Sequence, residues 1–77
     1  MTELSDKLKT QLKVEYEKSF SPNVPVMSLK IKWGADNHNA LVRAIEELVA
    51  NGIITKNNGT ITITTKGLES MGKLPNQ

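Results

Sequence analysis

The sequence contains no cysteine and few aromatic residues. Without cysteine, the chain forms neither a disulfide framework nor a zinc site with thiolate ligands. Its one histidine cannot hold a metal ion alone. One phenylalanine, one tyrosine and one tryptophan do not suggest an aromatic platform on which bases stack. These shortages exclude disulfide-stabilised domains and structural zinc modules.

Long apolar runs are also missing. No stretch approaches the roughly 18 apolar residues of a membrane span. The first residues lack the basic segment and apolar core of a secretory signal, so we expect a soluble, cytoplasmic protein without a membrane partner. A chain of 77 residues is predicted to form one domain, residues 1–77. Such a domain buries only about 60 to 65% of its unfolded surface, so a partner or a dimer would add to its modest stability.

The residue combinations typical of enzymes are absent as well. Glu46 and Glu47 are adjacent, so on a helix they point about 100° apart and do not converge as an acid/base pair. Asp36 and His38 offer two metal ligands without a third nearby. The five glycines are scattered and form no phosphate-binding loop. We expect no enzyme activity, no metal and no small-molecule cofactor.

Apolar residues recur every four positions near the N-terminus, which predicts a first helix over about residues 4–20 with a slanted apolar stripe. Ser5 or Thr2 is the expected N-cap of this helix. Two prolines follow at positions 22 and 25 and end the helix, because proline removes a backbone donor and makes its predecessor extended. The stripe consists of Leu4, Leu8, Leu12, Tyr16 and Phe20.

The strongest pattern runs from residue 37 to 64. Apolar residues at helical spacing predict a second amphipathic helix, with Val42 and Val49 widening its stripe. Gly52 is the expected left-handed stop of this helix. Asn58-Gly59 predicts a hairpin with a type I′ turn, which needs positive φ at both residues. Thr60 to Thr64 alternates apolar and polar residues, as in a half-buried strand. The helical face comprises Leu41, Ala44, Ile45 and Leu48.

This order of helix, glycine, apolar pair and hairpin resembles the second half of a winged helix-turn-helix domain. The resemblance covers roughly residues 28–70 and implies a small α+β fold with three helices, a β-hairpin wing and a short C-terminal helix. It places the helix-turn-helix at about 28–51, the wing at about 53–64 and the last helix at about 65–73. The residues that carry it are Leu41, Ile45, Leu48, Gly52, Ile53, Ile54 and Thr65-Lys66-Gly67.

Residues 26–33 fit two interpretations. Apolar residues alternate with Ser28, Lys30 and Lys32, which is typical of a strand. The same apolar residues also form pairs four apart, which fits a short helix ended by Gly34. The resemblance predicts this helix, after a brief strand at about 25–27, with Asp36 or Asn37 capping the next helix. We expect Trp33 to be a core residue.

Polar residues at the front of the central helix suit base recognition in the DNA major groove. Asparagine pairs with adenine, arginine with guanine, and histidine bonds to either. Basic residues around this helix, and the polar wing, would reach phosphates or groove edges. The predicted base-reading residues are Asn37, His38, Asn39 and Arg43. The predicted phosphate or wing contacts are Lys30, Lys32, Lys56, Asn57, Asn58, Thr60 and Lys66.

Two functions follow from these residues. The first is a transcriptional or mobile-element regulator that binds double-stranded DNA, as a homodimer or with a second protein. The second is a protein-interaction module, an adaptor or antagonist of another regulator, which the net charge of only +2 favours. Asparagines at helix starts and turns also occur for capping alone. A continuous positive strip would favour DNA, whereas an exposed apolar patch around Val14, Val42 or Trp33 would favour a protein partner.

Overall fold

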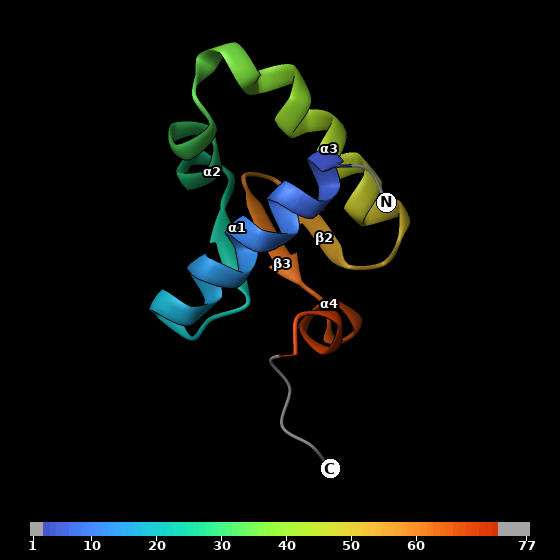
Figure 1. Ribbon diagram of the computed structural model, residues 1–77. Helices are drawn as coiled ribbons and strands as arrows, with labels where there is room; N and C mark the ends of the chain where they lie inside the picture. Colours follow the sequence, from blue (N-terminus) through green and yellow to red (C-terminus); the bar gives the residue numbers. More distant parts are fainter. Residues whose placement is uncertain (1–2, 73–77) are drawn as a thin grey trace.

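The computed structural model describes residues 3–72, which form four helices, a short 3-10 turn and three strands (Figure 1). In Figure 1, α1 crosses in front of the strands, α2 and α3 lie above them, and α4 lies below. This arrangement confirms the predicted small α+β fold with a winged-helix layout. The elements are α1 (Glu3–Ser19), β1 (Asn23–Pro25), α2 (Val26–Trp33), η1 (Ala35–Asn37), α3 (His38–Ala50), β2 (Ile54–Asn57), β3 (Thr60–Ile63) and α4 (Thr65–Ser70).

The three strands form one antiparallel sheet in the order β1-β3-β2. The central strand β3 places Ile61 and Ile63 on the buried face, as its alternation predicts. Val24 of β1 and Lys56 of β2 lie opposite Ile61 on its two sides. The brief strand before α2 therefore exists, two residues earlier than expected, and it joins the hairpin into a three-stranded sheet.

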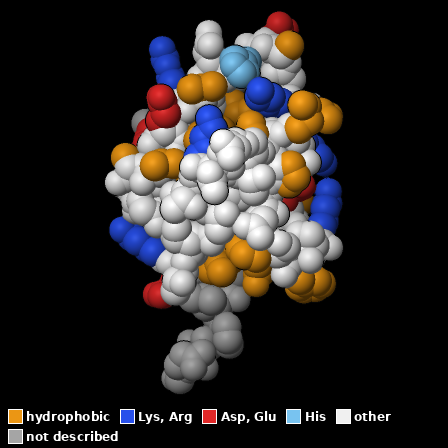
Figure 2. All heavy atoms as spheres, turned by 180° about the vertical axis from the view of Figure 1, so that it is seen from behind, with side chains coloured by type: hydrophobic (Ala, Val, Ile, Leu, Met, Phe, Trp, Pro, Cys, Tyr) orange, Lys and Arg blue, Asp and Glu red, His pale blue; other side chains and the backbone are white. Residues whose placement is uncertain are grey.

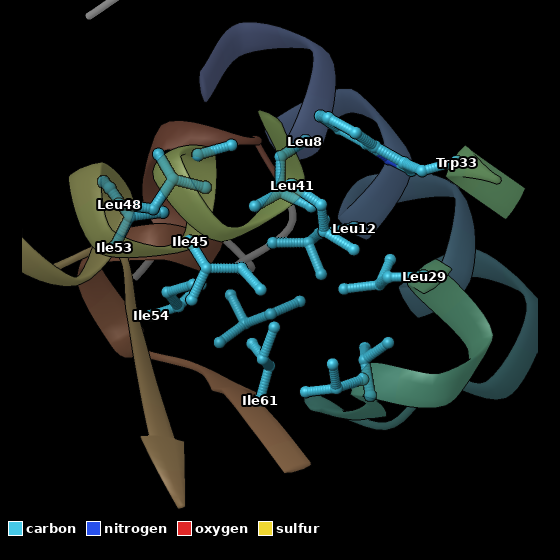
Figure 3. Close-up of a cluster of buried hydrophobic side chains, with 14 of the residues drawn as sticks. Leu8, Leu12, Leu29, Trp33, Leu41, Ile45, Leu48, Ile53, Ile54 and Ile61 are labelled. Atoms are coloured by element: carbon cyan, nitrogen blue, oxygen red, sulfur yellow. The ribbon is translucent and has the colours of Figure 1, made fainter. Parts of the chain in front are cut away.

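The core lies between the sheet and the first three helices (Figure 3). Leu8 and Leu12 of α1 lie beside Leu41 of α3, and Leu48 of α3 lies beside Ile53; these four leucines and Leu29 are almost completely removed from solvent. Trp33 is only 6% exposed, which confirms its predicted place in the core. The Nζ atom of a lysine on α1, Lys7, lies 4.7 Å from the centroid of the Trp33 ring, a cation–π contact that joins α1 to α2.

Residues 26–33 are helical. Val26, Leu29 and Trp33 lie three and four positions apart and are the buried residues of α2. The period-two alternation arises because Met27 and Ile31 are apolar although they face solvent. Gly34 ends α2 with a φ of 85°, as the helical interpretation requires.

Two expectations for the first helix are wrong. The helix α1 ends at Ser19, close to the expected end, but Phe20 has a φ of 55° and is 81% exposed, so Phe20 does not belong to the apolar stripe as expected. Ser5 does not cap the helix, because it lies inside α1, is buried, and donates a 3.0 Å hydrogen bond to Oε1 of Glu47. The other expected cap, Thr2, lies outside the described residues.

The hairpin closes with a two-residue turn, but its type differs from the prediction. Asn58 has a positive φ of 57°, whereas Gly59 has no positive φ, so the turn is not type I′. The predicted left-handed stop at Gly52 is confirmed, with a φ of 75°. Thr64 caps α4, because its Oγ1 accepts a 3.0 Å hydrogen bond from the backbone N–H of Gly67. The helix α4 ends at Ser70, earlier than the expected residue 73.

Within residues 3–72, no helix combines the length and the apolar composition that crossing a membrane requires. In the same part of the chain, no three His, Asp or Glu side chains are grouped so that they could hold a metal ion.

Candidate interface on helix α3 and the wing

Helix α3 is buried on one side and exposed on the other. Its inner side packs against α1 through Leu41, Ala44 and Leu48. Seen along the helix axis, Asn39, Arg43 and Glu46 lie on the opposite side, and all three are exposed. We call these three residues the outer ridge of α3. The side chain of Arg43 makes no hydrogen bond or ion pair within residues 3–72, so its guanidinium is available to a partner.

The start of α3 is held by a different contact from the one predicted. Asn37 occupies the N-cap position, yet its side chain does not cap the helix. Instead, Nδ2 of Asn37 donates a 2.7 Å hydrogen bond to the carbonyl oxygen of Trp33, the last residue of α2. This bond fixes the turn between α2 and α3. The side chain of the predicted base-reading residue Asn37 is therefore already held by a structural hydrogen bond, although the residue is exposed, as His38 and Asn39 are.

A groove of about 710 Å³ runs between α2, α3 and the tip of the wing. Figure 2 shows this face of the molecule, where hydrophobic side chains lie between basic side chains and beside the histidine. Its basic and polar lining comes from three segments: Lys30 of α2, His38 of α3, and Lys56 and Asn58 of the wing. The rest of the lining is Val26, Met27, Leu41, Val42, Ile45, Glu46, Val49, Ala50 and Gly59. The groove is the feature that brings these three segments together, and its floor is largely apolar.

The remaining predicted contacts are distributed elsewhere. Lys32 is two residues beyond Lys30 on α2, so the two side chains point about 160° apart and Lys32 does not line the groove. Lys66 lies near Gly52, at the far end of α3 from His38, because a Cβ on Gly52 would be 3.8 Å from Nζ of Lys66. Asn57 is exposed and Thr60 is half-buried on the hairpin outside the groove lining. The basic side chains therefore do not form one continuous strip.

The apolar part of the groove was not anticipated from the sequence. Val42 and Val49 were expected to widen the buried stripe of α3, but Val42 is 38% exposed and Val49 similarly so. Met27, from α2, is 64% exposed beside them. The available signal was the width of the stripe, since six apolar positions on a short helix exceed what one packing face covers. An exposed apolar patch that includes Val42 is the feature expected for a protein partner.

A second hollow of about 410 Å³ adjoins the groove. Lys30 and His38 line both spaces, so the two are continuous along α2. The second hollow adds Ile31, Gly34 and Ala35 to the surface, and Ile31 is strongly exposed. Together the groove and this hollow follow α3 from its N-terminal turn to its last residues.

Comparisons of the chain with models of protein families, with curated proteins and with solved structures found no match.

Proposed function

We propose that the protein is a winged-helix DNA-binding protein, a transcriptional or mobile-element regulator that reads the major groove with α3. The observation that carries this proposal is that Asn39 and Arg43 are exposed on the outer ridge of α3, while basic side chains of α2 and of the wing line the groove beside that ridge. Lys30 of α2 and Lys56 of the wing supply these side chains. Basic side chains on one face of a protein can neutralise a phosphate backbone together, even when they come from separate elements. The placement of these side chains therefore matters more than the small net charge of the chain.

The outer ridge of α3 supplies the residue types needed for base readout. Asn39 and Arg43 are four positions apart and exposed on the same side of the helix. An α-helix fits the major groove, where an asparagine side chain pairs with adenine and an arginine with guanine. Lys30 and Lys56 both line the groove beside α3 and would contact phosphates.

The acidic pair on α3 limits which part of the helix approaches DNA. Glu47 accepts a hydrogen bond from Ser5 of α1 and is therefore turned away from the outer ridge. Glu46 is exposed on that ridge and would repel phosphate. Binding would then use the first half of α3, residues 38–43, together with the wing tip. A single module has a small footprint, so a homodimer on a palindromic site is the expected functional form.

The direct test is an NMR titration of isotope-labelled protein with a short generic duplex, at low and then moderate salt. We expect shifts at residues 38–43 and at the wing tip, residues 56–59, and we expect them to fade as salt rises. The amides of α1 serve as an internal reference, because α1 packs on the inner side of α3. Shifts confined to α1, or no shifts at low salt, would contradict DNA binding by this domain.

A further inference from the structure

The apolar floor of the groove is not explained by phosphate contacts. Val42 and Val49 of α3 and Met27 of α2 keep much of their surface in solvent and lie together in one concave space. A concave patch of exposed apolar side chains with a polar rim is typical of a protein-binding site. The methionine side chain also adapts to an irregular apolar partner surface, because it is unbranched and flexible.

The shape of the groove indicates an elongated occupant. Through Lys30 and His38 the groove continues into the second hollow, so that apolar surface extends from Val49 and Ala50 to Ile31 and Ala35. Helix α3 has 13 residues and is therefore about 20 Å long. A partner helix of roughly 13 to 15 residues matches this length, whereas a small molecule would fill only part of it.

The charged residues around the groove indicate the sign of the charge that the occupant carries. Lys30 stands on the α2 side and Lys56 on the wing side, and His38 lies between the two hollows. Glu46 is the one carboxylate of the groove lining. Two lysines against one carboxylate give the lining an excess of positive charge, which favours an occupant that carries acidic residues beside its apolar surface.

A helix satisfies these requirements better than an extended strand does. Its apolar residues form one stripe, and residues beside the stripe point sideways, where they can reach the charged side chains of the groove lining. In a strand, the polar residues point directly away from the apolar face and so away from Lys30 and Lys56. We propose that the groove binds an amphipathic helix of another protein, one with an apolar stripe flanked by acidic residues.

A second copy of this chain does not supply such a helix within the part that the structure describes. The apolar residues Leu8 and Leu12 of α1 are buried in the core, and so are those of the inner side of α3. Outside the groove, the exposed apolar residues Val14 and Phe20 do not form a helical stripe, since Phe20 lies beyond the end of α1. A second copy could otherwise offer only its own groove residues, and these come with the same two lysines, so two positively charged linings would face each other and repel. The occupant is therefore assigned to a different protein. This proposal goes beyond DNA binding and does not depend on it.

The test uses the full chain, labelled on its valine and methionine methyl groups, and a synthetic peptide of about 15 residues. The peptide carries leucines at helical spacing with glutamates on both flanks. One control peptide has the same composition in scrambled order, and another has lysine in place of glutamate. We expect saturable shifts of Val42, Val49 and Met27 with the acidic helix, and affinity at least about tenfold lower for both controls.

Matched variants locate the binding. Val42→Asp places a carboxylate in the groove and should weaken binding about tenfold or more. Val14→Asp is its control, because Val14 on α1 has the same 38% exposure but lies outside the groove lining. Met27→Asp is the second groove variant, at a site so exposed that folding does not depend on it. Circular dichroism checks that each variant folds.

Several results would overturn the proposal. These are failure of the acidic peptide to bind, equal binding of the scrambled peptide, and binding unchanged by both Val42→Asp and Met27→Asp. Methyl shifts that change on dilution without peptide would assign the groove to a second copy of this chain. Duplex DNA that shifts Val42 and Val49 while the peptide does not would assign it to DNA. Because the peptide titration contains no DNA, its failure is distinct from failure of the proposed DNA binding.

Discussion

The hydroxyl of Ser5 donates a 3.0 Å hydrogen bond to Oε1 of Glu47 and so joins α1 to α3 across 42 positions of sequence. Ser5 is fully buried at this contact, although serine is usually exposed. The bond also separates the two adjacent glutamates of α3: Glu47 faces α1, while Glu46 remains on the outer ridge. The contact thus determines both helix packing and the charge of the candidate interface.

Replacing Ser5 by alanine should destabilise the domain by about 1 kcal/mol. A hydrogen bond to a charged acceptor contributes about 1.5 to 3 kcal/mol, and the higher helix propensity of alanine offsets part of this loss. Urea denaturation of the wild type and Ser5→Ala measures the difference. Ser19→Ala, at the exposed end of α1, is the control and should change stability less. Equal midpoints for Ser5→Ala and the wild type would contradict a contribution larger than the gain in helix propensity.

Truncating a side chain on the buried side of α3 should lower the free energy of unfolding much more than Ser5→Ala does. Leu48 is completely buried between α1 and the sheet, and Leu48→Ala should lower the free energy of unfolding by about 2 to 5 kcal/mol. The neighbouring Val49 is partly exposed in the groove, so Val49→Ala should cost less than about 1 kcal/mol. Thermal melts of the two variants compare them directly. A larger loss from Val49→Ala would refute the assignment of inner and outer sides of α3.

Gly67 should tolerate no side chain. A Cβ at this position of α4 would collide with the carbonyl oxygen of Ile53 and lie 2.9 Å from Cγ2 of Ile63. Gly67→Ala should therefore cost about 2 kcal/mol or more, because the backbone of the sheet must move. Gly59→Ala is the matched control, since nothing lies within 4 Å of its Cβ position and its φ is not positive. Similar melting temperatures for the two variants would contradict the close approach of α4.

The central helix and hairpin were predictable because their signals are local. Gly52 and Asn58 adopt positive φ where the pattern requires it, and Ile61 and Ile63 alternate with threonines within one strand. The hydrogen bond of Ser5 to Glu47 and the contact of Gly67 with Ile53 were not predictable, because each depends on how distant segments meet. The local spacing of apolar residues indicates which side of a helix or strand is apolar, but it does not indicate which other segment packs against that side.

The candidate site was predictable only in part for the same reason. His38, Asn39 and Arg43 were predicted to face a partner, and all three are exposed. The sequence analysis named an apolar patch around Val42 only as one of two possible outcomes, because the sequence pattern of α3 does not reveal that α2 and the wing leave Val42 and Val49 partly uncovered. Asn37 was assigned to base readout, yet its side chain bonds to the end of α2.

If the protein binds DNA, Lys56→Ala should weaken binding to all sequences alike. Lys56 lies on the wing side of the groove, and a phosphate contact carries no sequence information. Removing one such contact should reduce the steepness of the plot of log binding constant against log salt concentration by about one. Fluorescence anisotropy at several salt concentrations measures this slope. Lys13→Ala, on the exposed side of α1, removes the same charge from another face and should leave the slope unchanged.

Arg43→Ala should act on specificity instead. The exposed guanidinium of Arg43 lies four residues after Asn39 on the outer ridge, where a bidentate bond to guanine would discriminate between bases. Selection from a random duplex library first identifies the preferred site of the wild type. The variant should lose about 1 to 3 kcal/mol on that site and much less on unrelated duplexes. An equal loss on every duplex would make Arg43 a phosphate contact, because only a base contact changes the ratio between sites.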